Sequence, residues 1–330
     1  MPESFWLVVL LVVLALVFDF LCGVRDCASV VATVIASRAL SGRQALTIAA
    51  IAEFIGPFLF GVAVATTIGK DLLNSDEIQL SVVIAALLAA ITWNLFTLWR
   101  GLPSSSSHAL VGGLIGAAVI QNGWSVIQPA GLGKVLLALA ISPPLGFLTG
   151  YLVTKVVLFL ARGATPSINT FFKRGQIPTS FALALSHGTN DAQKAMGVIA
   201  LGLVSAGVIP SFYVPQWVVV ACAAAIALGA FLGGWRLIRT LGGKLYKIRP
   251  MDGFNTQIAS SGVILSMALL GGPVSTTQVV SSAIVGVGSA ERLSKVRWSV
   301  AANIGIAWLL TIPITVLLGA VLSAILGRLQ

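Results

Sequence analysis

The sequence predicts an all-α integral membrane protein with two inverted-topology repeats and broken or re-entrant helices. Three observations lead to this fold class: the composition, the series of apolar segments, and two motifs that each occur twice. Apolar residues make up 57% of the 330 positions and charged residues only 9%, whereas soluble domains carry about 25% charged residues. Such a chain lacks the polar surface that water requires, so lipid must be the solvent for much of it.

The apolar segments include both full crossings and shorter pieces. A helix that crosses a bilayer needs about 20 residues, so segments 26–37 and 275–288 are too short and 254–270 is marginal. Short pieces interrupted by Gly and Pro predict broken or re-entrant helices, which a membrane tolerates only where they line a cavity. The segments are 5–22, 26–37, 45–68, 79–99, 103–121, 134–160, 177–205, 216–235, 254–270, 275–288 and 299–326.

The net charge of +10 does not indicate nucleic acid, because the Lys and Arg residues lie in short loops between apolar segments. This distribution is the positive-inside pattern of a multi-pass protein of the cytoplasmic membrane. The loop that contains Asp71, Asp76 and Glu77 is net acidic, so we expect it to lie outside. The same orientation places the N-terminus outside. The basic clusters, expected inside, are Arg38/Arg43, Arg162/Lys173/Arg174, Arg236/Arg239/Lys244/Lys247/Arg249 and Arg292/Lys295/Arg297.

Two motifs occur once in each half of the chain and in the same order. The stretch Gly23–Ser29 matches Gly188–Lys194, and Pro103–His108 matches Pro273–Gln278. Because the second half enters the membrane from the opposite side, the two halves should be inverted repeats. Such repeats place the binding site near the bilayer midplane, where broken helices meet.

These motifs divide the chain into three parts. The first transmembrane repeat is residues 1–160, the second is 177–330, and a cytoplasmic loop of residues 161–176 connects them.

Each hydroxyl-rich motif follows a Gly-containing break and a Pro and precedes an apolar run, which suits the start of a helix. A helix start offers free backbone N–H groups and the positive end of the helix dipole. Two such starts that converge would form a cage for a tetrahedral oxyanion. The alternative is that the hydroxyls only pack and bond back within membrane helices. The residues are Ser105, Ser106, Ser107, His108, Ser275, Thr276, Thr277 and Gln278.

Asp26, Glu53 and Asp191, acids inside apolar segments, are candidates for ion coupling. Asp19 also lies in an apolar segment but has no repeat partner. A charge inside the bilayer is costly, so such groups are functional candidates by default. They could carry a proton or bind a coupling Na⁺, the latter at Asp26 and Asp191. The alternative is a structural ion pair of Arg25 with Asp26 and of Lys194 with Asp191. No other cofactor and no firm metal site is predicted.

At these motifs the chain resembles the inorganic phosphate transporter (PiT) family. The family's signatures read approximately G-A-N-D-x-A-N and H-G-A-N-D-A-Q-N, and its P-x-S-T-T-H-A stretches resemble Pro103–Ala109 and Pro273–Val279. The likeness covers nearly the whole chain. It implies a secondary transporter of inorganic phosphate, coupled to Na⁺ or H⁺, that forms a homodimer in the lipid membrane. Arg25, Asn190 and Lys194 lie within the two signatures, and we expect them to contact the substrate.

The chain departs from the family pattern where the coupling ion is concerned. Arg25 and Ser29 replace the two asparagines of the first signature, and Lys194 replaces the last asparagine of the second. Gln278 lies where a His is usual. Two fixed cations therefore flank the two aspartates. We hypothesise that they take the place of Na⁺ and leave either proton coupling, with Asp191 or Glu53 as the proton carrier, or uncoupled exchange.

Two other functions compete with phosphate transport. The first is transport of sulfate or another oxyanion in the same fold. Phosphate near neutral pH carries P–OH donors and sulfate carries none, so a carboxylate acceptor in the site favours phosphate. The second is a membrane-embedded enzyme that acts on a lipid or phosphate ester. The chain shows no nucleotide-binding motif and no nucleophile–base pattern, so we do not expect an enzyme.

Overall fold

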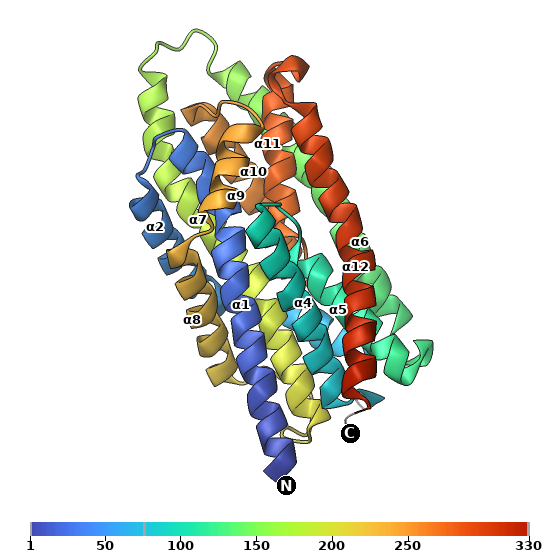
Figure 1. Cartoon of the computed structure of the whole chain (residues 1–330). Coiled ribbons are helices and arrows are strands. Elements are labelled where there is room, and N and C mark those ends of the chain that lie inside the picture. Colours follow the sequence, from blue (N-terminus) through green and yellow to red (C-terminus); the bar gives the residue numbers. More distant parts are fainter. Residues whose placement is uncertain (1, 75–76, 329–330) are drawn as a thin grey trace.

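The computed structural model describes residues 2–74 and 77–328, and most of the described part is helical (Figure 1). The α-helices are α1 Pro2–Ala36, α2 Gly42–Ile55, α3 Ala63–Thr66, α4 Leu80–Arg100, α5 Ser106–Asn122, α6 Pro129–Leu160, α7 Ile168–Ser205, α8 Gln216–Leu232, α9 Trp235–Arg239, α10 Pro250–Leu269, α11 Thr276–Glu291 and α12 Trp298–Leu326. Two π-helical turns, η2 Thr67–Asp71 and η5 Thr240–Lys244, extend α3 and α9.

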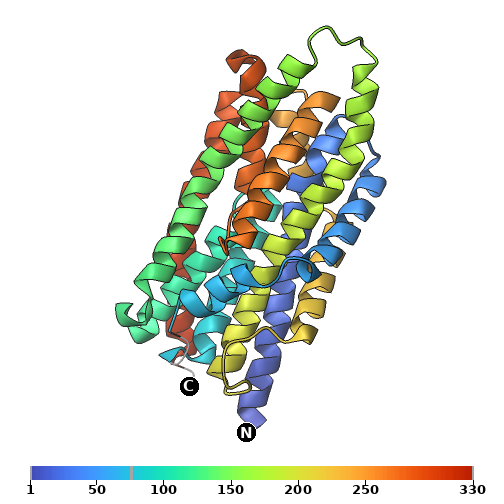
Figure 2. The same ribbon diagram turned by 180° about the vertical axis from the view of Figure 1, so that it is seen from behind.

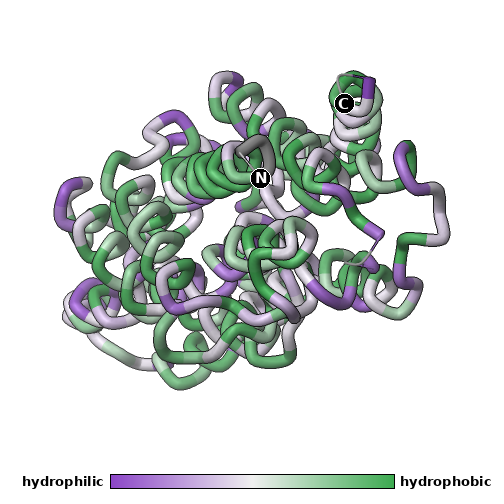
Figure 3. Tube along the Cα trace, turned by 90° about the horizontal axis from the view of Figure 1, so that it is seen from below, coloured by the Kyte–Doolittle hydropathy of each residue, from purple (hydrophilic) through white to green (hydrophobic). Residues whose placement is uncertain are grey.

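Four of the described helices are long and apolar enough to cross a membrane: Phe5–Ala36 within α1, and α4, α6 and α12. Two further pairs pass the same test together but are bent, by 69° between α2 and α3 and by 60° between α8 and α9. Seen from below, along the helices, most of the trace is hydrophobic (Figure 3). The structure thus has several helices able to span a membrane and two bent pairs, as the sequence predicts.

Helix α7 has 38 residues but is not among the candidate spans. Its middle carries a run of polar side chains, among them His187, Asn190, Asp191 and Lys194, and these are buried. The second half of α7, residues 186–203, is buried, and α7 packs against α1 and α2. A helix segment that is enclosed by protein rather than lipid needs no continuous apolar run.

The prediction of a separate short segment at 26–37 is wrong, because α1 continues from Pro2 to Ala36 through Gly23. A β-carbon at Gly23 would lie 2.1 Å from the carbonyl oxygen of Ile226 on α8. This glycine therefore serves close helix packing rather than a break. Helix α7 begins at Ile168, so part of the predicted 161–176 loop is helical. Asp76 lies outside the described residues.

Two helical hairpins form the centre of the fold. Helices α4 and α5 form one, with Gly101 in the left-handed conformation at its tip (φ 66°), and α10 and α11 form the other, with Gly271 (φ 70°). The hairpins enter the bundle from opposite ends and their tips meet in the middle (Figures 1 and 2). Each second helix starts where the sequence predicts: Ser105 accepts the His108 N–H, and Ser275 accepts the Gln278 N–H.

Close glycine contacts recur with the two halves exchanged. A β-carbon added at Gly23 would lie 2.1 Å from a carbonyl oxygen of α8, and one added at Gly188 would lie 2.5 Å from a carbonyl oxygen of α2. A β-carbon added at Gly116 would lie 2.0 Å from a carbonyl oxygen of α12, and one added at Gly286 would lie 2.1 Å from a carbonyl oxygen of α6. Helices α1 and α7 are neighbours that run in opposite directions (Figure 1). Small residues let these helix backbones approach in a medium where the hydrophobic effect does not pack helices together.

Candidate functional site

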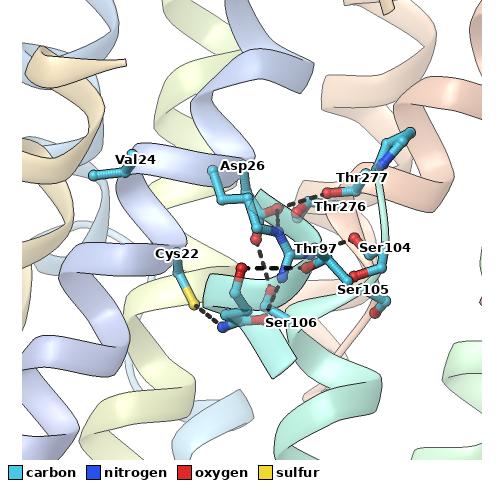
Figure 4. A network of polar contacts seen from close by, with 12 residues as sticks. Cys22, Val24, Asp26, Thr97, Ser104, Ser105, Ser106, Thr276 and Thr277 are labelled. Carbon is cyan, nitrogen blue, oxygen red and sulfur yellow. Dashed lines mark hydrogen bonds and ion pairs between the residues drawn. The ribbon is translucent and has the colours of Figure 1, made fainter. Parts of the chain in front are cut away.

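The hairpin tips meet the middle of α1 and α7, and there the structure gathers most of the polar residues that the sequence singles out. Asp26 is the centre of the first part of this cluster (Figure 4). Its carboxylate accepts a 2.7 Å bond from the Ser106 hydroxyl and a 2.9 Å bond from the Thr277 hydroxyl. The Arg25 Nε lies 3.3 Å from the same carboxylate. One acid thus binds hydroxyls from both hairpins.

Arg25 is buried, with 1% of its surface exposed, and also holds the first hairpin in place. Its guanidinium donates to the Asn94 side-chain oxygen and to the Ser104 carbonyl. Asn190, the matched residue of the second motif, donates a 3.2 Å bond to the Gly272 carbonyl at the other tip. The two matched positions therefore make matched contacts, one with a charged side chain and one with a neutral one.

Asp191 is the centre of the second part. One carboxylate oxygen accepts a 2.8 Å bond from the Lys194 ammonium, and the other accepts a 3.3 Å bond from the Thr276 hydroxyl. The His187 Nε2 is 3.4 Å from Asp191, and its Nδ1 is 3.0 Å from Glu53. A neutral imidazole can donate to only one of these acids, whereas an imidazolium can donate to both. The three residues therefore form a natural place for a proton.

The two parts touch. Ligand atoms of Asp26, His187 and Asp191 all lie within 4.8 Å of one another, so this geometry could hold a cation. Two carboxylates so close in a low-dielectric interior require positive charge nearby. Arg25 and Lys194 provide it from within the chain, one to each aspartate. The structural ion pairs considered from the sequence are thus present.

The other predicted residues lie around this cluster with different roles. Ser105 and Ser275 cap their helices, and Ser107 donates a 2.9 Å bond to a backbone carbonyl in the opposite tip. His108 Nδ1 is 2.7 Å from the Ser105 hydroxyl. His108 and Gln278 line a cavity of about 620 Å³ between α6 and α12, away from the aspartates.

Asn94 and His187 are not among the site residues predicted from the sequence. Asn94 lies in an ordinary apolar segment and in neither repeated motif. Its one signal is that it is a polar residue within a membrane helix. His187 precedes the second motif by one residue, but its contact with Glu53 joins α7 to α2 and cannot be read from spacing.

The arrangement suits an anion. The helices α5 and α11 begin at the cluster, so their first N–H groups and dipoles point at it, together with hydroxyls and two buried cations. Ionisable residues buried in the middle of a membrane bundle mark a substrate or ion pathway. Fold and site together define a membrane transporter.

Comparison with known proteins gives the family. The phosphate transporter family matches residues 22–319, and the chain belongs to this family. It is 43% identical over 319 residues to a "Probable low-affinity inorganic phosphate transporter" of Rhizobium meliloti, with 96% of each chain covered. It is 40% identical over 327 residues to a Bacillus subtilis protein of the same description, with 98% of each covered. The resemblance seen in the sequence motifs is confirmed, and the family is one of transporters rather than enzymes.

A solved structure is also similar. "The sodium-dependent phosphate transporter" matches with a TM-score of 0.88 and 26% sequence identity, covering 98% of this chain and all of that one.

Loss of one buried cation should destabilise the protein, and loss of its partner acid as well should restore much of the stability. Lys194→Met leaves Asp191 charged and unpaired, at a cost of about 3–5 kcal/mol. We expect a clear fall in the thermal unfolding midpoint in detergent, with partial recovery in Lys194→Met/Asp191→Asn. Lys155→Met, at an exposed position on α6, is the control and should change little. Equal midpoints for Lys194→Met and the parent would contradict the ion pair.

Proposed function

We propose that this protein is a secondary transporter that moves inorganic phosphate across the cytoplasmic membrane, coupled to an ion. The observation that carries the proposal is the contact of hydroxyls from both hairpins with one carboxylate, Asp26. Hydroxyl and backbone donors suit the phosphate oxygens, and a carboxylate suits a P–OH group, which sulfate lacks. The descriptions of the similar proteins name the same substrate.

On binding, phosphate would take over donors that now serve the aspartates. The hydroxyls of Ser106 and Thr277 would turn from Asp26 to phosphate oxygens, and the carboxylate of Asp26 would accept a hydrogen bond from the P–OH group. Arg25 and Lys194 would offset the charge of the anion. Because Arg25 also binds the first hairpin tip, any shift of its guanidinium toward phosphate would loosen that tip.

Transport of sulfate or another oxyanion is the second candidate. The ion pairs of both aspartates favour this second candidate, because a carboxylate paired with a cation repels a dianion such as sulfate less than an unpaired carboxylate does. The two candidates differ in the need for a P–OH donor.

The architecture that we propose for transport is a pair of inverted repeats, residues 1–160 and 177–330. The exchanged glycine contacts and the opposite directions of α1 and α7 support it. The basic clusters favour an outside N-terminus and an inside connection near residues 161–176. Movement of one repeat against the other would then expose the site to each side in turn. A homodimer remains a prediction from the family resemblance.

Uptake in proteoliposomes tests the substrate. Labelled phosphate should enter liposomes that contain no phosphate ester, unlabelled phosphate should compete, and equal sulfate should compete at least tenfold more weakly. Equal competition by sulfate would instead support the broader oxyanion transporter. Absence of any phosphate uptake by folded protein would refute phosphate transport.

For the coupling ion, we propose a proton rather than Na⁺. Each aspartate that could bind Na⁺ already has a tethered cation, at 3.3 Å for Arg25 and 2.8 Å for Lys194. The His187 ring between Glu53 and Asp191 offers a place for a proton. The description of the similar solved structure specifies sodium dependence for that protein, so the two outcomes can be compared directly.

Phosphate uptake at fixed pH should change less than twofold when Na⁺ is replaced by K⁺ or choline. The double variant Arg25→Asn/Lys194→Asn frees both aspartates and should acquire a Na⁺ requirement if it folds. A steep Na⁺ requirement in the parent, unchanged in the double variant, would show that the tethered cations do not replace the ion.

A further inference from the structure

One buried acid is not used by the site described above. Asp19, in the middle of α1, has no exposed surface. No nitrogen or oxygen of the described residues donates a hydrogen bond to either of its carboxylate oxygens. Its polar neighbour is the thiol of Cys222 on α8, and a thiol is only a weak donor. An ionised carboxylate in such a place is strongly unfavourable.

Asp19 differs from the other acids in the middle of the bundle in having no basic partner among the described residues. Asp26 has Arg25, Asp191 has Lys194, and Glu53 has His187 as a basic partner, each within 3.3 Å. Among the described residues at this depth, Asp19 is the acid for which no such partner is found. When His187 is protonated, the charges of these three acids and their three basic partners cancel. An ionised Asp19 then leaves one uncompensated negative charge. The seven groups in this balance are Asp19, Asp26, Glu53, Asp191, Arg25, Lys194 and His187; buried Asp252 pairs separately with Arg249 and Lys295, and buried His108 contacts Ser105.

Asp19 lies on the same face of α1 as the substrate cluster. Asp19, Cys22 and Asp26 have the spacing i, i+3 and i+7, which is one helix face. At 1.5 Å per residue, Asp19 is about 10 Å from Asp26 along the axis, toward the N-terminus. The proposed topology puts that end outside. The charged and titratable groups around Asp19 are Cys22 and Asp26 on α1, His187, Asp191 and Lys194 on α7, Glu53 on α2 and Cys222 on α8.

The surroundings of Asp19 select the cation that can neutralise it. Hard cations such as Na⁺ take several oxygen ligands, whereas Asp19 has a thiol beside it and no described hydroxyl or amide bonded to it. A proton needs no further ligand, because it forms a covalent O–H bond to the carboxylate itself.

We propose that Asp19 is a proton-binding residue of the transport cycle, an inference that rests on the proposed function. Asp19 takes up one proton from outside water when the site is open to that side. Neutral Asp19 removes the uncompensated negative charge, so the phosphate anion binds more favourably at Asp26 and Asp191. By linkage, phosphate binding then favours the protonated acid. The same proton leaves to inside water after the site opens to the cytoplasm, and no other bond forms or breaks.

The experiment compares two activities of Asp19→Asn, which is a permanent mimic of the neutral acid. The first is exchange of external labelled phosphate for internal unlabelled phosphate at equal pH on both sides. The second is net accumulation driven by an inside-alkaline pH gradient. We expect exchange within about twofold of the parent and a loss of at least tenfold in gradient-driven accumulation.

Three further variants make the result decisive. Asp19→Glu keeps a titratable acid and should keep gradient-driven accumulation. Cys222→Ala removes the neighbouring thiol but keeps the acid, and should keep both activities. Asp19→Ser is a second neutral variant in case the Asn variant does not fold, as judged by its unfolding midpoint in detergent.

The outcomes separate this inference from the function on which it rests. Full gradient-driven accumulation by a folded neutral variant would overturn the role of Asp19 and leave phosphate transport intact. Equal loss of exchange and accumulation in a folded neutral variant would also overturn it, because Asp19 would then serve binding or structure. Failure of the parent itself to exchange phosphate would instead refute the proposed function.

Discussion

The burial of two carboxylates within a few ångströms of each other is the constraint on which the rest of the structure depends. Asp26 and Asp191 can exist there only with positive charges and hydrogen-bond donors around them. Arg25 and Lys194 supply the charges, and the hairpin tips supply the donors. The tips can reach the aspartates because glycines let the helix backbones approach. Packing, chain breaks and ion pairs thus all serve one buried site.

The two halves have corresponding contacts but different chemistry. Ser106 bonds Asp26 and Thr276 bonds Asp191, so the matched hydroxyls serve matched acids. The cations are not matched: Arg25 corresponds to the neutral Asn190, and Lys194 corresponds to Ser29. His187 contacts Asp191 with one ring nitrogen and Glu53 with the other. This asymmetry gives the Asp191 side a place for a proton that the Asp26 side lacks.

Much of the fold could be predicted from the sequence where the physical signal is local. The helix starts at Ser106 and Thr276 follow from Pro, a capping Ser and an apolar run. The break predicted near Gly23 is wrong, because a glycine that permits close packing has the same appearance in sequence as a glycine that ends a helix. The contact between Asn94 and Arg25 joins two distant segments. Such a partner cannot be inferred from one sequence, since no local pattern specifies it.

The most direct test of the shared site is a double-mutant cycle for phosphate binding by Ser106→Ala and Thr277→Val. Both hydroxyls donate to Asp26, but they come from opposite hairpins. If both serve one phosphate, the double variant should depart from additivity by about 1 kcal/mol or more. The control pairs Ser106→Ala with Thr92→Val, an exposed position on α4, and should be additive. Additivity of Ser106→Ala and Thr277→Val within about 0.3 kcal/mol would contradict a site shared by the two halves.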